Sequence, residues 1–397
     1  MSADFEDIRP YKDSEVPRVL ARLVADPELH DTIARMKYPR LARWLPWVFR
    51  GPIKARLEEA FAGASDVASF QQVIGHYWWG LMEKQTRDIT VSGLEKLNPK
   101  ASYLFICNHR DIAVDPAVVG LCLDRGGFGT PRIAIGDNLL TKPFTSDLMR
   151  LNKSFIVKRS VSGRREKLAA LLQLSGYIRH SICQENSSIW IAQREGRAKD
   201  GLDRTDTALI KMLSLSKGKE QEFAEAMGQL NIVPVTLSYE LDPCDGYKAR
   251  ELYEVEKHGS YQKSEHEDLK SIYKGIVGEK GLVHVAFGEP LTADELESAD
   301  TIAAAIDQHV IENYHQHSSN LIAYNVLHGD HPNLSTMREK LALSDQEWAE
   351  REQQFKQRMQ ELPAEHRNIA LAGYANSVVS QIGLQGQESH PREGGDP

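Results

Sequence analysis

The stretch YLFICNHRDIAVDPAVV, residues 103–119, contains an apolar run, a polar segment and the start of a helix-like segment. Its first five residues are apolar or aromatic and predict a short buried strand, whereas Pro116 is typical of the first turn of a helix. A polar segment that starts with Asn108 and His109 joins the two. Ligands bind at the carboxyl ends of strands in open α/β sheets, so this position favours a functional site. A polar turn with helix-capping contacts and a solvated histidine is the alternative interpretation.

Short apolar runs alternate with longer amphipathic segments beyond this stretch, which is typical of a layered α/β domain. The expected strands are residues 103–107, 132–136, 154–158, 188–192, 232–239 and 283–288. The expected helices between them are residues 116–124, 145–151, 164–184, 205–215 and 220–229. Because the strands are nearly continuous apolar runs, we expect helices on both faces of their sheet.

The predicted fold class is therefore α/β, with a layered mixed sheet covered by helices and with helical extensions at both ends. The predicted parts are a helical N-terminal region at 1–84, a central α/β domain at 85–320, a helical C-terminal extension at 321–385 and a disordered tail at 386–397. In the C-terminal extension, Ser335 and Ser344 are expected to begin helices, and Glu347 can complete a capping box with Ser344.

The composition is that of an ordinary folded protein, with 41% hydrophobic and 26% charged residues. A formal net charge of −8 gives no general attraction to nucleic acid or anionic lipid. The four cysteines are widely spaced, which argues against a disulfide framework and a structural zinc site and favours a reducing cytoplasm. We expect no secretory signal, and no apolar stretch reaches the ~20 residues needed to cross a bilayer.

The segment HVIENYHQH, residues 309–317, contains three histidines, a residue type that can bind metal ions. The segment predicts an amphipathic helix and has no nearby carboxylate pattern, so we interpret His309, His315 and His317 as solvated side chains. We predict no metal.

Two further strands end in polar residues that could bind an anion, and they follow the apolar runs of NKSFIVKRS (152–160) and IWIAQREGRAKDG (189–201). The residues concerned are Lys158, Arg159, Glu195, Gly196 and Arg197. Glycine permits close approach of the backbone to a ligand, and an arginine can bind phosphate through two parallel hydrogen bonds. Solvated polar loops are the alternative interpretation of both stretches.

Four stretches, taken in order, resemble the motifs of the glycerolipid acyltransferase superfamily, which includes the 1-acylglycerol-3-phosphate and glycerol-3-phosphate acyltransferases. NHRDIAVD resembles the first motif, FIVKRS the second in its glycerol-3-phosphate form, EGR the third and IVPV the fourth. The resemblance covers about residues 100–240. Pro234, within IVPV, predicts an edge strand or a bulge. A kinase interpretation of the HRD triplet fails, because the chain contains neither DFG nor a glycine-rich phosphate loop.

The resemblance implies that His109 accepts the proton of an acceptor hydroxyl, which attacks an acyl thioester directly without an acyl-enzyme. The absence of a GxSxG nucleophile motif agrees with direct attack. The implied phosphate ligands are Arg159 and Arg197, with Lys158 as a further cation. Glu195 is expected to organise this cluster or to bind a glycerol hydroxyl. Asn108 and Gly196 complete the predicted substrate-binding set.

The first motif departs from the family pattern at its acidic residue. The family has four residues between the histidine and the aspartate, whereas five separate His109 from Asp115, and Val114 stands at the expected position. Either a one-residue bulge makes Asp115 the carboxylate that orients the imidazole, or Asp111 takes that role. We favour Asp115, because a longer loop can be absorbed before the helix that contains Pro116.

Residues 33–57, here called the basic-aromatic segment, contain no acidic residue. Their cations are Arg35, Lys37, Arg40, Arg43, Arg50, Lys54 and Arg56, and they alternate with Tyr38, Trp44, Trp47 and Phe49. This composition is typical of a segment that lies at a membrane interface. Packing of the aromatic rings onto the rest of the protein is the alternative.

The predicted function is transfer of a fatty acyl group from acyl-CoA or acyl carrier protein to 1-acylglycerol-3-phosphate or glycerol-3-phosphate, in phospholipid biosynthesis. The thioester is a co-substrate, and no other cofactor is expected. The predicted location is the cytoplasm, at the inner face of a membrane, with no nucleic-acid partner. A non-catalytic lipid-binding or scaffold protein that keeps the fold is the alternative.

Overall fold

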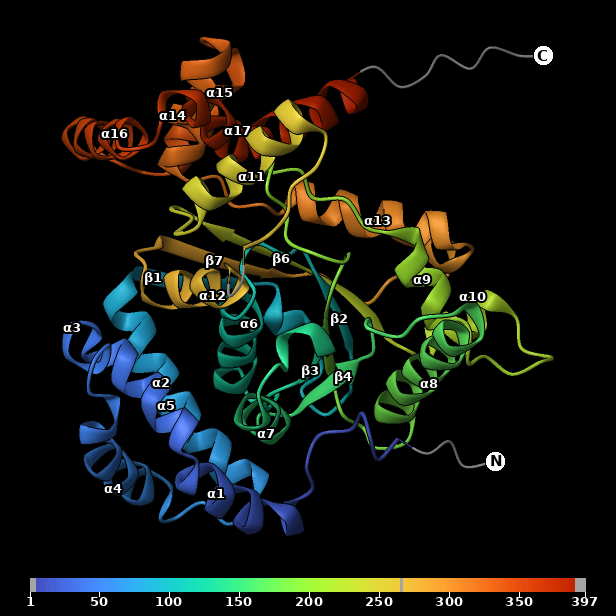
Figure 1. The fold of residues 1–397 in the computed structure, drawn as a ribbon. Coiled ribbons are helices and arrows are strands. Elements are labelled where there is room, and N and C mark those ends of the chain that lie inside the picture. The colour runs from blue at the N-terminus through green and yellow to red at the C-terminus, as the bar shows by residue number, and fades with distance from the viewer. Residues whose placement is uncertain (1–4, 265–266, 390–397) are drawn as a thin grey trace. The chain divides into compact units, whose positions relative to one another are not determined.

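The computed structural model describes residues 5–264 and 267–389, and these residues form two compact units (Figure 1). The first unit comprises the described residues up to Gly80 together with Thr130–Trp190. The second comprises Leu81–Gly129 together with the described residues from Ile191 onward. The domain boundaries predicted at residues 84, 320 and 385 stay a prediction. The predicted disordered tail lies outside the described residues from residue 390 on, and its first four residues belong to a helix that ends at Ser389.

The strands of the second unit form a mixed sheet. In spatial order they are β1 (Thr86–Ser92), β7 (Gly281–Phe287), β6 (Ile232–Tyr239) and β2 (Leu104–Cys107). β1 runs parallel to β7, β6 runs antiparallel to β7, and β2 runs parallel to β6. β6 is buried along its whole length and has a neighbouring strand on each side. The α/β fold class with a mixed sheet is thus confirmed.

The prediction that Pro234 marks an edge strand or a bulge is wrong, because β6 is an interior strand. Pro234 is in register with Ile106 of β2, and its carbonyl accepts a hydrogen bond from Gly288 N at 2.9 Å. The last β6–β7 pair is Val235 with Phe287, so the proline nitrogen lies just beyond that ladder. A central strand tolerates proline here, because the hydrogen bond that it cannot donate toward Gly288 lies beyond the last β6–β7 pair.

The helices of the second unit are α6 (Val114–Arg125), α9 (Thr207–Leu213), α10 (Phe223–Gly228), α11 (Asp245–His258), α12 (Glu267–Val277), α13 (Ala299–Glu312), α14 (Ser318–His328), α15 (Pro332–Lys340), α16 (Asp345–Gln360) and α17 (Ala364–Ser389). Short 3₁₀ turns lie at Leu94–Lys96 and Asp294–Leu296. Buried side chains of α11, α14, α16 and α17 share one hydrophobic cluster. The C-terminal helices therefore pack against the element that directly follows β6.

Two cap predictions in the C-terminal helices have different outcomes. Ser344 caps α16 and forms the predicted capping box with Glu347. The prediction for Ser335 is wrong, because α15 begins at Pro332 and His331 caps it. A proline at the first helical position is pre-organised for helix initiation, so it outweighs the serine signal three residues later.

The interpretation of the three histidines as solvated residues of one helix is only partly correct, because His309 does lie in α13 (Ala299–Glu312). α13 ends at Glu312, so His315 and His317 lie in the connection that leads to α14. His317 is buried, and its Nε2 lies 3.2 Å from Ser238 Oγ of β6. The His315 ring lies next to His317 and to His284 of β7, with ring centroids 4.9 and 5.1 Å apart. His317 therefore belongs to the interior of the unit, whereas His315 and His284 are half-buried.

The first unit contains a parallel set of strands in the order β5 (Ile189–Ala192), β3 (Arg132–Gly136) and β4 (Ser154–Val157). Its helices are α1 (Val16–Ala25), α2 (Pro27–Lys37), α3 (Pro39–Ala42), α4 (Arg50–Phe61), α5 (Val67–Gln85), α7 (Pro143–Leu151) and α8 (Arg164–Cys183). The 3₁₀ turns are Asp13–Glu15, Pro46–Phe49 and Asp137–Leu139. Apolar residues of α1, α5 and α7 form its main helical core. Throughout the described ranges, we find no helix with the length and apolar character that crossing a membrane requires.

Candidate active site

His109 lies directly after β2, where the chain leaves the sheet. Its side chain is 14% exposed, and Nδ1 lies 2.8 Å from Asp115 Oδ2. The carbonyl of His109 accepts a hydrogen bond from Ala198 N at 2.8 Å, which attaches this loop to the loop after β5. Hydrogen bonds therefore hold both the imidazole and the backbone carbonyl of His109, and the imidazole remains partly accessible to solvent.

Asp115 is the most constrained group of the site. It is fully buried at the first turn of α6, where the helix dipole favours a negative charge. Besides the imidazole, its Oδ2 accepts hydrogen bonds from Arg110 N at 2.6 Å and Asp111 N at 2.9 Å. Its Oδ1 accepts a hydrogen bond from Tyr239 Oη at 2.8 Å. These donors fix the carboxylate and compensate its charge in place of water.

Asp111 has a different task from Asp115. Its Oδ1 accepts hydrogen bonds from Ala113 N at 3.0 Å and Val114 N at 2.9 Å, which forms a side-chain turn just before α6. This turn accommodates the additional residue of the loop and directs Asp115, not Asp111, to the imidazole. Burial, followed by the charge of Asp115, raises the pKa of Asp111 above its ordinary value.

Tyr239 is a site residue that the sequence analysis missed. It ends β6, and its hydroxyl donates to the carboxylate oxygen that does not contact the imidazole. Burial and the neighbouring carboxylates raise the pKa of Tyr239 well above its ordinary value, so the hydroxyl stays a donor. The only sequence signal was a tyrosine at the end of a predicted strand, which is not specific.

Asn108 is predicted to bind substrate, and that role stays a prediction. The side chain is fully buried, its Oδ1 accepts a hydrogen bond from Leu237 N at 2.8 Å, and its Nδ2 donates to Leu237 O at 3.0 Å. Nδ2 also lies 3.2 Å from Asp203 Oδ2. The hydrogen bonds to Leu237 hold the loop between β2 and α6 against β6.

The loop after β5 brings Arg197 to the same region. Arg197 is half-buried, and its Nη1 donates to Ser271 Oγ of α12 at 2.8 Å. The next residue, Ala198, bonds to the carbonyl of His109. Gly196 has a φ of +78°, which glycine adopts without strain, and both Glu195 and Gly196 are exposed. The third motif thus lies beside the first.

Residues 88–238 match the family model described as Acyltransferase. This stretch of the chain is an acyltransferase domain. The matched stretch contains all four sequence stretches that resemble acyltransferase motifs.

A comparison with solved structures found the 1-acyl-sn-glycerophosphate acyltransferase PlsC from Thermotoga maritima, at 12% identity and a TM-score of 0.37. The match covers 72% of this chain and 95% of that protein. A comparison with curated proteins found no match.

The two cations of the second motif belong to the first unit, within the stretch that matches the acyltransferase domain. Lys158 pairs with Asp7, and its Nζ donates to Gln173 Oε1 of α8 at 2.9 Å. The backbone N–H of Arg159 donates to Asp137 Oδ1 at 3.1 Å, and so the start of this loop is held by the turn after β3. The phosphate role predicted for both residues stays a prediction.

No group of three histidine, cysteine or acidic residues suited to a metal ion occurs among residues 5–264 and 267–389.

Proposed function

We propose that the protein transfers a fatty acyl group from acyl-CoA or acyl carrier protein to a glycerol-phosphate acceptor, either 1-acylglycerol-3-phosphate or glycerol-3-phosphate, in phospholipid biosynthesis. The observation that carries this proposal is the hydrogen-bonded pair of His109 and Asp115 at the end of β2, within an acyltransferase domain. The donor, the acceptor and the mechanism below belong to the proposal.

The pair suits general base catalysis. Asp115 faces Nδ1, so the neutral imidazole carries its proton there and has its lone pair on Nε2. In the proposed reaction Nε2 accepts the proton of the acceptor hydroxyl while the oxygen forms a bond to the thioester carbonyl carbon. The tetrahedral intermediate collapses with cleavage of the carbon–sulfur bond, and the imidazolium returns the proton to the departing thiolate. Asp115 remains ionised and stabilises the imidazolium.

The loop with Arg197 is the proposed place for the acceptor phosphate. A guanidinium matches the geometry of phosphate oxygens, and the exposed Gly196 allows the backbone to approach the ligand closely. Ala198 ties this loop to His109, so an acceptor held there would have its glycerol end near the imidazole. Lys158 and Arg159 are proposed to contribute further positive charge to phosphate binding.

The basic-aromatic segment is proposed to bind an anionic membrane surface on the cytoplasmic side. Trp44 is 74% exposed, Leu41 63% and Trp47 56%. The packing alternative holds for part of the segment, because Phe49 stacks on Tyr38 with ring centroids 4.7 Å apart. Exposed indoles next to arginines are suited to the headgroup region, where the rings insert and the cations contact phosphates.

An acyl-transfer assay on the purified protein tests the proposed reaction. It crosses the two acceptors with the two thioester donors and includes His109→Gln as the control. We expect turnover with at least one pair and its loss in the control. If no pair supports turnover while the folded protein still binds lipid vesicles, the protein is the non-catalytic lipid-binding alternative.

Sedimentation with vesicles tests the membrane contact separately. Binding should require anionic lipid and weaken in salt, because exposed charges are screened over about 10 Å at about 0.1 M ionic strength. Replacing Trp44 and Trp47 with alanine should reduce the binding that survives salt, whereas Tyr77→Ala, at an exposed ring outside the segment, should not. Equal binding of both variants would contradict a role for the segment.

A further inference from the structure

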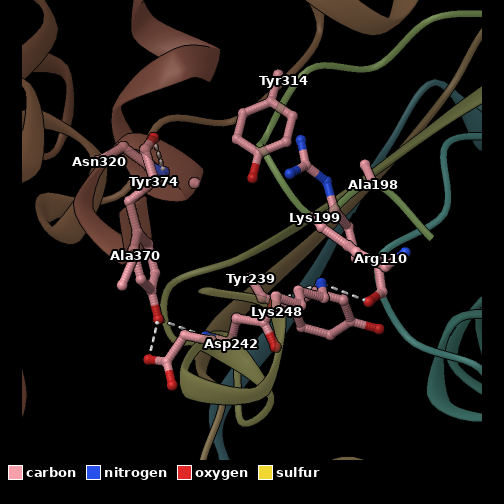
Figure 2. Close-up of a pocket in the computed structure, with 12 residues that line it drawn as sticks. Arg110, Ala198, Lys199, Tyr239, Asp242, Lys248, Tyr314, Asn320, Ala370 and Tyr374 are labelled. Carbon is pink, nitrogen blue, oxygen red and sulfur yellow. Dashed lines mark hydrogen bonds and ion pairs between the residues drawn. The ribbon is translucent and has the colours of Figure 1, made fainter. Parts of the chain in front are cut away.

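A small polar cavity is lined by Arg110, the residue after His109, and by residues of α11, α14 and α17 (Figure 2). It holds about 30 Å³ of free space, which admits water but no substrate. Its lining includes Arg110, Lys199 and Lys248, and each of these cations is paired with a carboxylate: Asp203, Glu251 and Asp242, respectively. The cavity is therefore a packed ionic network rather than a binding pocket.

Lys248 connects this network to the site. It lies on α11, it is buried, and its Nζ donates to the backbone carbonyl of Arg110 at 2.8 Å and pairs with Asp242, as Figure 2 shows. Burial raises the pKa of Asp242, but the charge and hydrogen bond of Lys248 lower it below its ordinary value. The ion pair thus favours the charged carboxylate of Asp242 in the interior, and the Lys248 side chain is directed onto a main-chain oxygen.

That oxygen belongs to the peptide group between Arg110 and Asp111. The N–H of the same peptide group, on Asp111, donates to Asp115 Oδ2 at 2.9 Å. Because a peptide group is planar, its C=O and N–H cannot rotate independently. Lys248 on one side and Asp115 on the other therefore fix one plane, and loss of the ammonium would release the plane that orients the carboxylate facing His109.

The C-terminal helices hold Lys248 in turn. Tyr374 of α17 accepts a hydrogen bond from Asp242 N at 2.9 Å and donates to Asp245 Oδ2 at 3.0 Å. Arg358 of α16 donates to Asp242 O at 2.8 Å and to Asp245 Oδ2 at 2.7 Å. These contacts fix the turn between β6 and α11, from which Lys248 reaches Arg110.

α17 also contacts the loop that follows Arg197. Asn376 Nδ2 donates to Asp200 O at 2.7 Å. A Cβ on Gly201, which has a φ of +78°, would lie 2.3 Å from Gly373 O of the helix. Only glycine permits this close approach, so α17 lies directly against the loop of the third motif.

We propose that Lys248 is a positioning residue for the acyl transfer and that the C-terminal helices serve to hold it and the Arg197 loop in place. The ammonium acts through the Arg110–Asp111 peptide group on Asp115, and through Asp115 on His109. The kinetic part of this claim rests on the proposed function, whereas its effect on the imidazole does not.

Four variants separate positioning from folding. Lys248→Met removes the ammonium but leaves the buried carboxylate of Asp242 unpaired, which destabilises the fold. The double variant with Asp242→Asn removes that unpaired charge. Asp242→Asn alone keeps Lys248 on the Arg110 carbonyl. Lys199→Met is the matched control, because Lys199 lines the same cavity and pairs with Glu251 of the same helix, α11, whereas it is Lys248 that donates to the Arg110 carbonyl.

The expected kinetic result is a fall of kcat by about 10- to 100-fold in Lys248→Met, as small misplacements of catalytic groups produce, with little change in the acceptor KM. The double variant should regain thermal stability but not kcat. Asp242→Asn should lose less activity than Lys248→Met, and Lys199→Met should stay near wild type.

The imidazole itself gives a readout that needs no turnover. Histidine ¹⁵N NMR, with His109→Gln used for assignment, reports which ring nitrogen carries the proton. We expect the Nδ1–H form in the wild type and in Lys199→Met, and a mixture of tautomers in Lys248→Met and in the double variant. A single Nδ1–H form in all four proteins overturns the proposal. If the wild type shows no turnover but the tautomers change as expected, the proposed function fails and the positioning role stands.

Discussion

Asp115→Asn tests the pair at the centre of the site. An asparagine fits the same space, but its amide nitrogen cannot face the Oδ2 position, where Arg110 N and Asp111 N both donate. The carbonyl oxygen therefore takes that position, and the amide faces Tyr239, whose hydroxyl can turn to accept. The imidazole keeps a neutral acceptor at Nδ1 and so keeps its tautomer.

Asp115→Asn therefore removes only the negative charge beside the imidazole and keeps the hydrogen bond. A hydrogen bond to a charged group contributes about 1.5–3 kcal/mol, against about 1 kcal/mol for a neutral one. A difference of about 1.4 kcal/mol changes a rate tenfold, so kcat should fall by roughly 10- to 100-fold. This fall in kcat should be smaller than the fall of about 10,000-fold caused by the corresponding aspartate-to-asparagine change in a serine protease triad, because that change also reverses the histidine tautomer.

Asp111→Asn is the matched control for this substitution. Its side-chain oxygen can accept the same two backbone hydrogen bonds before α6, and the raised pKa of Asp111 indicates that its surroundings tolerate a neutral group. Both variants are compared by acyl transfer and by thermal unfolding. The reasoning is refuted if Asp111→Asn loses as much kcat as Asp115→Asn while both proteins remain folded.

Three further predictions concern neighbouring groups. Tyr239→Phe leaves one oxygen of Asp115 without its donor, so urea denaturation should show a loss of about 1–3 kcal/mol in unfolding free energy; an unchanged value would contradict the hydrogen bond. Arg197→Ala should raise the acceptor KM by about 10- to 100-fold, and a rise in the donor KM instead would place the thioester carrier's phosphate there. Burial lowers the pKa of His284 from 6.5 to about 4. Between these two pKa values the unfolded chain binds a proton at His284 that the folded chain does not, so the unfolding free energy decreases as the pH is lowered through this range. His284→Gln should therefore lose less unfolding free energy than the wild type on acidification from about pH 7 to about pH 5, and an equal loss would contradict this cause.

Much of the sheet could be predicted, because burial on both faces leaves a local signal. The run at 103–107 and the run at 232–239 correspond to β2 and β6 almost residue for residue. β1 (Thr86–Ser92) was not predicted, since its alternating polar residues give no apolar run. Pairing with β7 determines its structure, and no local pattern reports such a pairing.

The site was predictable to the extent that its residues are neighbours in sequence. His109 and its carboxylate lie in one motif, but the choice between Asp111 and Asp115 depends on a side-chain turn that the spacing alone does not specify. Tyr239 and Lys248 reach the loop from more than 100 positions away in sequence, with separations of 124 and 138 residues. Contacts of that kind exist only once the chain has folded.

The most direct test of the central claim is the rate of acyl transfer by His109→Ala relative to wild type, at saturating donor and acceptor. A general base contributes about 100- to 10,000-fold, so the account predicts a fall of kcat within that range in a variant whose thermal unfolding is unchanged. If the folded variant keeps more than about a tenth of the wild-type rate, His109 is not the base and the proposed mechanism is wrong.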